Sequence, residues 1–204
     1  MNLIIFGATG TIGRHLTAQA AAKGHTVTAF ARNPRDLPAG VTAAKGDVLN
    51  PSDVKAAMQG QDAIIVVLGN GMKGGLRAPG TANIVAGMRA QGINRLICQS
   101  TLGAGDSRQN LNFFWKYLMF GLLLRRAYKD HQRQEVIIRA SGLDWTIVRP
   151  GAFTDGPLTG AYRAGFGPTD RSVKLKISRA DVAHYLLRVL GDAASIGRTP
   201  GLSY

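Results

Sequence analysis

Short apolar or strand-like runs alternate with longer segments along the whole chain. The runs cover residues 3–6, 25–30, 41–48, 63–68, 95–99 and 145–148. Runs of this length, bounded by longer segments, are typical of strands that helices bury on both faces of a sheet. The alternation predicts an α/β fold with one doubly wound parallel sheet and helices on both faces.

Capping signals mark where several of the intervening helices begin. A cap residue, a proline and an acidic residue occur within residues 50–53 and predict a helix start there. Ser178, with Asp181 three residues later, predicts a capping box. We therefore expect further helices over residues 80–91, 127–140 and 178–190.

The first predicted strand ends in a glycine-rich turn with the spacing G-x-x-G-x-x-G. Gly7 permits a tight turn, Gly10 lets backbone approach a phosphate closely, and Gly13 lets a helix pack on the strand. Unpaired N–H groups at the start of the following helix attract a pyrophosphate. An ordinary strand-to-helix turn is the alternative. The motif predicts a Rossmann-type dinucleotide site formed by Gly7, Thr9, Gly10, Thr11, Ile12 and Gly13.

The second predicted strand indicates which dinucleotide binds. An acidic residue after this strand holds the ribose hydroxyls of NAD, whereas an arginine accommodates the 2′-phosphate of NADP. Arg32 lies just after the end of this strand, Arg35 follows, and the first carboxylate is that of Asp36. We therefore predict NADP(H) as the cofactor, with Arg32 and Arg35 at the phosphate unless both are merely solvated loop residues.

Ligands in open α/β sheets bind at the carboxyl edge of the strands. Residues at the ends of the fourth, fifth and sixth predicted strands should therefore surround the nicotinamide. This group comprises Leu68, Gly69, Ser100, Thr101 and Pro150.

His131 is a further candidate, because a neutral imidazole beside a cofactor phosphate or substrate carboxylate titrates in the physiological range. Helical spacing also allows a local pair with Glu135. We take Ser100, Thr101 and His131 as candidate catalytic residues.

The proton-relay signature Tyr-x-x-x-Lys is absent from the chain. Reduction of a simple carbonyl needs an acid to protonate the developing alkoxide. Conjugated acceptors such as flavins spread the incoming charge and can take a proton from water, so mainly proximity and orientation are needed. The absence favours a flat acceptor.

Composition bounds the class of protein. The 204 residues carry 25 Lys plus Arg against 12 acidic residues, a net charge of +13. The basic residues are scattered and no recognition motif accompanies them, so we expect anionic small molecules rather than nucleic acid. No metal-ligand spacing occurs. The single cysteine, Cys98, excludes an internal disulfide and indicates a packed thiol in a reducing compartment. With no basic leader evident at the start, we expect one cytoplasmic domain over residues 1–204.

One stretch departs from the alternation and indicates an insertion at about residues 104–126. Within it, residues 111–124 are dense in aromatic and aliphatic side chains and are followed by Arg125 and Arg126. This stretch is too short and interrupted to span a bilayer. It can form a helix packed at the sheet edge or a dimer contact, a lid over a flat substrate, or a membrane-surface helix. A monomer and a homodimer both remain open.

The chain resembles the flavin reductase and biliverdin-IXβ reductase group of atypical short-chain dehydrogenases over nearly its whole length. Besides the Arg32 position, the resemblance rests on residues 6–10, 46–49, 61–66, 68–69, 130–131, 141–143 and 157–162. It implies reduction of flavins, linear tetrapyrroles or quinone-like dyes by NADPH. It also implies that Asp47 and Val48 contact the adenine and that Ser100 and Thr101 lie beside the nicotinamide.

The sequence thus favours an NADPH-dependent reductase of a flat acceptor such as FMN. Two alternatives stay open: a regulatory protein that senses NADP(H) without turnover, and an epimerase or isomerase of a nucleotide-linked substrate.

Overall fold

The computed structural model describes residues 1–204 and contains one large sheet. Its strands are β1 (Asn2–Phe6), β2 (Thr26–Ala31), β3 (Thr42–Lys45), β4 (Ala63–Val66), β5 (Arg95–Gln99), β6 (Asp144–Pro150), β8 (Arg163–Ala164) and β10 (Gly201–Ser203). They are ordered β3-β2-β1-β4-β5-β6-β10-β8. All pairings are parallel except that of β8 with β10. The order from β3 to β6 is that of a Rossmann fold and confirms the predicted parallel sheet.

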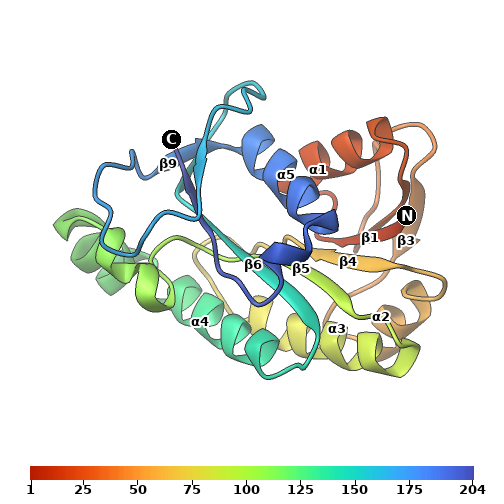
Figure 1. The fold of residues 1–204 in the computed structure, drawn as a ribbon. Helices are drawn as coiled ribbons and strands as arrows, with labels where there is room; N and C mark the ends of the chain where they lie inside the picture. The colour runs from red at the N-terminus through yellow and green to blue at the C-terminus, as the bar shows by residue number, and fades with distance from the viewer.

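Helices cover both faces of the sheet (Figure 1). Helices α1 (Thr11–Ala22) and α5 (Arg179–Arg188) lie on one face, and α2 (Pro51–Ala57), α3 (Arg77–Gln91) and α4 (Arg125–Arg139) lie on the other. Each face has its own apolar core, because alternate residues of the central strands point to opposite sides. In β1, Leu3 and Ile5 enter one core and Ile4 and Phe6 the other.

The remaining elements are short. Strands β7 (Ala152–Thr154) and β9 (Lys176–Ser178) pair in parallel, apart from the main sheet. Three 3₁₀ turns occur at Gly105–Asn110, Val189–Gly191 and Ala193–Ser195. The aromatic stretch contains a π-helix, Phe114–Leu123, directly before α4. No helix combines the length and the apolar character that crossing a membrane would require.

Several predicted boundaries are wrong, among them the end of the fourth strand, which lies at Val66 instead of Leu68. The third strand is confined to Thr42–Lys45, because the chain turns at Gly46 and the N–H of Asp47 donates to Asp53. The sixth strand continues through Pro150, which as its last residue interrupts no later pairing. Helix α3 begins three residues earlier than predicted.

The early start of α3 has a tertiary cause. Asp130 of α4 accepts hydrogen bonds from the N–H groups of Leu76, Arg77 and Ala78 at 2.9–3.1 Å. These N–H groups have no partner within their own helix, so the carboxylate of another helix acts as the cap.

Both predicted helix caps are present, at Asn50 and at Ser178, but the second is not a complete capping box. The side chain of Asn50 accepts from the N–H of Ser52 at 3.1 Å. The hydroxyl of Ser178 accepts from the N–H of Asp181 at 3.0 Å. The carboxylate of Asp181 does not return to the N–H of Ser178, which donates instead to the Tyr204 hydroxyl. The Asp181 carboxylate accepts hydrogen bonds from the N–H groups of Thr159 and Gly160 and from the hydroxyl of Tyr204.

Candidate active site

A cleft of about 540 Å³ opens at the carboxyl edge of the central strands. Most of the residues singled out from the sequence line it, although they come from separate parts of the chain. They are Gly7, Thr9, Gly10, Thr11, Ile12, Arg32, Asp47, Val48, Leu68, Gly69, Ser100, Thr101, His131 and Pro150. Gly13 and Arg35 do not line the cleft.

The turn between β1 and α1 leaves backbone donors facing the cleft. Gly7 has φ +88°, and a Cβ there would lie 2.6 Å from the carbonyl oxygen of Val67. At Gly13 a Cβ would overlap the carbonyl oxygens of Gly7 and Ala8, which is why this position packs against the turn. The N–H groups of Thr11 and Ile12 have no acceptor within the chain. A helix start of this kind fits a phosphate group.

Beyond β2 the cleft is lined by a basic and an acidic side chain. Arg32 is exposed and follows the buried end of β2. Asp47 accepts from the N–H of Leu49 at 2.9 Å, which fixes the turn after β3. Arg35 lies in a separate hollow that it shares with Arg14.

Ser100 is fully buried and belongs to a charged network beneath the cleft. Its hydroxyl donates to Glu135 at 2.7 Å. Glu135 also accepts from two nitrogens of Arg149 at 3.0 and 2.7 Å, and Arg149 reaches Asp106 at 2.5 Å. The proposed local pair between His131 and Glu135 is wrong, because Glu135 is occupied by Ser100 and Arg149.

The network is held by charge. Burial alone lowers the pKa of the Arg149 guanidinium, but its bonds to Glu135 and Asp106 raise that pKa overall. The same ion pair lowers the pKa of Asp106, because the hydrogen bond from Arg149 stabilises the ionised carboxylate. The predicted packing of Cys98 is confirmed, because this residue is fully buried, and the burial raises the pKa of its thiol.

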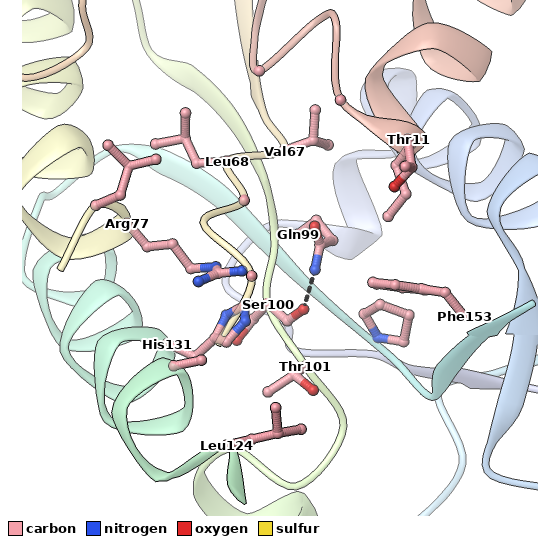
Figure 2. Close-up of a pocket in the computed structure, with 18 of the residues that line it drawn as sticks. Thr11, Val67, Leu68, Arg77, Gln99, Ser100, Thr101, Leu124, His131 and Phe153 are labelled. Carbon is pink, nitrogen blue, oxygen red and sulfur yellow. Dashed lines mark hydrogen bonds between the residues drawn. The ribbon is translucent and has the colours of Figure 1, made fainter. Parts of the chain in front are cut away.

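Thr101 presents the less constrained hydroxyl. It is half-buried, and its only hydrogen bond is a long one, 3.4 Å, to the carbonyl of Leu102. Figure 2 shows Thr101 projecting at the opposite end of the close-up from Val67 and Leu68. This hydroxyl, unlike that of Ser100, remains available to a ligand.

His131 and Arg77 line the cleft together, as Figure 2 shows, with the Arg77 guanidinium beside the imidazole. Nδ1 of His131 and Nε and Nη1 of Arg77 are buried without a hydrogen-bond partner. Burial, followed by the charge of Arg77, lowers the pKa of His131 well below its ordinary value. The imidazole is therefore neutral at pH 7.

The aromatic stretch supplies one wall of the cleft. The ring of Phe120 stacks on Tyr128 with centroids 4.8 Å apart, and Tyr128 donates its hydroxyl proton to the carbonyl of Gly103 at 2.8 Å. The side chains that form this wall are Leu111, Trp115, Phe120, Leu124 and Tyr128. Other members of the stretch do not line the cleft and are exposed, among them Phe113, Tyr117 and Leu122.

Several cleft residues have no clear signal in the sequence. Gln99 is the last residue of the predicted strand 95–99, and Phe153 lies five residues after the predicted strand 145–148, so neither belongs to the loop residues that the strand ends singled out. Arg77 follows an unremarkable glycine-rich stretch, and only its contact with a distant helix brings it to the site.

Comparison with known proteins agrees with this geometry. A family model described as NAD(P)H-binding matches residues 7–193. The uncharacterized sugar epimerase YhfK of Bacillus subtilis is 29% identical over 205 residues, which are 94% of this chain and 89% of the relative.

Two solved structures share the fold over nearly the full length. A Rossmann-fold NAD(P)-binding family protein from Shigella flexneri is 29% identical, with a TM-score of 0.77 and coverage of 99% of this chain and 92% of that chain. ChuY, an anaerobillin reductase from Escherichia coli O157:H7, is 25% identical, with a TM-score of 0.82 and coverage of 100% and 97%. These likenesses confirm the resemblance to atypical short-chain dehydrogenases. The chain therefore belongs to the NAD(P)H-binding family and has an oxidoreductase-type Rossmann fold.

Proposed function

We propose that the protein is an NADPH-dependent reductase that transfers hydride to a flat, conjugated acceptor, with a flavin such as FMN as the first candidate. The observation that carries this proposal is the make-up of the cleft. A turn suited to phosphate lies at one part of it, and aromatic and aliphatic side chains line another. A mostly apolar cleft with a few placed polar groups suits a nucleotide and a planar acceptor side by side.

The nucleotide would lie along the turn and the ends of β1 to β3. The unpaired N–H groups of Thr11 and Ile12 would bind the pyrophosphate, and the exposed Arg32 would bind the 2′-phosphate. Asp47 and Val48 would border the adenine. Bound there, NADPH supplies the hydride. Arg35, outside the cleft, is a weaker candidate for this contact.

The chain would contribute orientation rather than a strong acid. The hydroxyl protons of Ser100 and Tyr128 are committed to Glu135 and Gly103. Thr101 retains an available hydroxyl that would orient the nicotinamide or the acceptor. The cleft thus offers few side chains that could donate a proton to a reduced carbonyl. This supports an acceptor that delocalises charge over heteroatoms, as flavins, linear tetrapyrroles and quinones do.

The test is NADPH oxidation, followed by absorbance, on adding FMN, a linear tetrapyrrole or a quinone to the protein. We expect steady oxidation with at least one of these acceptors. Tight NADPH binding with no oxidation across all three would support a regulatory sensor instead. Interconversion of a nucleotide-linked sugar without net NADPH consumption would support an epimerase.

A further inference from the structure

We propose that Arg77 and His131 form a binding site for an anionic group, a carboxylate or a phosphate, that the acceptor carries. The two side chains come from different helices, α3 and α4, and both line the cleft. They are only 8% and 6% exposed. The inference rests on the proposed function for the acceptor itself and adds the charge that the acceptor bears.

Arg77 has more donors than the chain can satisfy. A guanidinium carries five N–H donors and no acceptor. The Nε and Nη1 groups of Arg77 are buried and have no hydrogen-bond partner. Leaving charged donors unpaired away from water is costly, and a ligand with acceptor oxygens removes this cost. An oxyanion with two oxygens is the natural complement of the guanidinium fork.

Asp130 does not fill this role. Its nearest oxygen is 3.9 Å from Nη1 of Arg77, which is beyond hydrogen-bond distance. Its two oxygens already accept from the three N–H groups at the start of α3. The other buried carboxylate nearby, Glu135, is neutralised by Arg149. The positive charge of Arg77 is therefore only partly compensated within the chain.

His131 adds a second unpaired group to the same site. Its Nδ1 is buried without a partner, and Figure 2 shows its ring next to the Arg77 guanidinium. A neutral imidazole donates through one nitrogen, so the tautomer with a proton on Nδ1 would give an anion a further donor. Arg77 and His131 together would hold an oxyanion from two sides.

The pair is separate from the turn that suits the cofactor pyrophosphate. In Figure 2, Thr11 at the start of α1 lies on one side of the view and Arg77 and His131 lie on the other, with Gln99 between them. The pair therefore lies away from the turn that we propose for the pyrophosphate. This separation assigns the pair to the acceptor.

The experiment compares ligands that differ only in the anionic group. The first pair is FMN and riboflavin, and the second is a linear tetrapyrrole dicarboxylic acid and its dimethyl ester. Binding of all four to the protein with saturating NADP⁺ is measured by fluorescence titration. We expect the anionic member of at least one pair to bind about tenfold or more tightly, as one charge-assisted hydrogen bond allows. The pair that discriminates tells whether phosphate or carboxylate is the group recognised.

The preference should disappear in Arg77→Met and shrink in His131→Leu, while affinity for the uncharged member stays the same. Arg133→Gln is the matched control, because it removes one exposed positive charge from α4 outside the cleft. A purely structural Arg77 would instead lower the melting temperature on replacement by Met. We expect that temperature to stay equal or to rise, since the variant removes unpaired buried donors.

Three results would overturn the inference: no preference in the wild-type protein for either anionic ligand, a preference that survives in Arg77→Met, or a loss of NADP⁺ affinity in Arg77→Met with acceptor binding unchanged. Binding needs no turnover, so the two proposals fail separately. A preference for anions without NADPH oxidation overturns only the reductase proposal, and oxidation without a preference overturns only the anion site.

Discussion

The hydroxyl of Ser100 is bound by the carboxylate of Glu135 at 2.7 Å, directly after β5. Glu135 is the only glutamate in the chain, and it also neutralises the buried Arg149. Ser100 is therefore tied to a structural ion network, although the sequence marks it as a candidate for chemistry. The neighbouring Thr101 has the hydroxyl that a ligand can reach.

Replacing Glu135 should destabilise the fold. We expect Glu135→Gln to lower the free energy of unfolding by about 2–4 kcal/mol, because Arg149 loses a buried counter-charge. Urea denaturation measures the change. Arg139→Gln is the control, since Arg139 is an exposed partner 3.7 Å from Glu135, and it should cost less than about 1 kcal/mol. Equal stability of Glu135→Gln and wild-type protein would contradict the role given to the network.

Substitutions at Thr101 and at Ser100 should have different effects, the first on turnover and the second on stability. Thr101→Ala is expected to lower kcat by about tenfold with NADPH affinity unchanged, because one orienting hydrogen bond is lost. Ser100→Ala should chiefly lower the free energy of unfolding, by about 1 kcal/mol. Steady-state kinetics and denaturation of the same two variants provide the comparison. Unchanged turnover in Thr101→Ala would remove that hydroxyl from the chemistry.

Arg32 should determine the preference of the protein for NADPH over NADH. We expect Arg32→Ala to weaken NADPH binding by about tenfold or more and NADH binding hardly at all, because only NADPH carries the 2′-phosphate. Calorimetric titration measures both affinities. Arg35→Ala is the natural comparison and should have the smaller effect, as Arg35 lies outside the cleft. Equal losses for both cofactors would argue against a phosphate contact at Arg32.

The inner face of the aromatic stretch should matter for the acceptor. Trp115→Ala and Phe120→Ala are expected to raise the KM for a flat acceptor several-fold, because each stacked ring contributes about 0.5–1.5 kcal/mol. Phe113→Ala is the control, since Phe113 is 77% exposed. If all three variants behave alike, the stretch does not act as a wall over the acceptor.

Stability should fall as the pH is lowered through the range of His131. Burial holds the pKa of His131 well below its usual range in the folded protein. The unfolded chain takes up the proton near pH 6.5, so it binds more protons than the folded chain below that pH. We expect His131→Gln to lessen the loss of unfolding free energy between pH 7 and pH 5. His25 and His184, whose pKa values burial also lowers, should account for some of the remaining slope.

The parts of the fold that depend on local sequence were predictable. The glycine turn, the buried strands and the caps at Asn50 and Ser178 each follow from neighbouring residues. The parallel strand order follows from their alternation with helices. For the same reason, most of the predicted site residues share one cleft.

Contacts between distant residues account for what was missed. The cap that Asp130 gives to α3 joins residues more than fifty positions apart. The network around Arg149 likewise joins three separate elements, and its only sequence signals are a lone glutamate and an arginine within an apolar strand. The π-helical winding of Phe114–Leu123 has no counterpart in the hydrophobic spacing that predicts ordinary helices.

The carboxylate of Asp130 clamps two helices that each contribute one half of the proposed anion site. Asp130 precedes His131 in α4 and binds the backbone N–H of Arg77 in α3 at 2.9 Å. The separation between the guanidinium and the imidazole is therefore built into the scaffold before any ligand arrives. A ligand that meets such a preorganised pair loses little affinity to ordering the protein, so even a small charged group can be selected there.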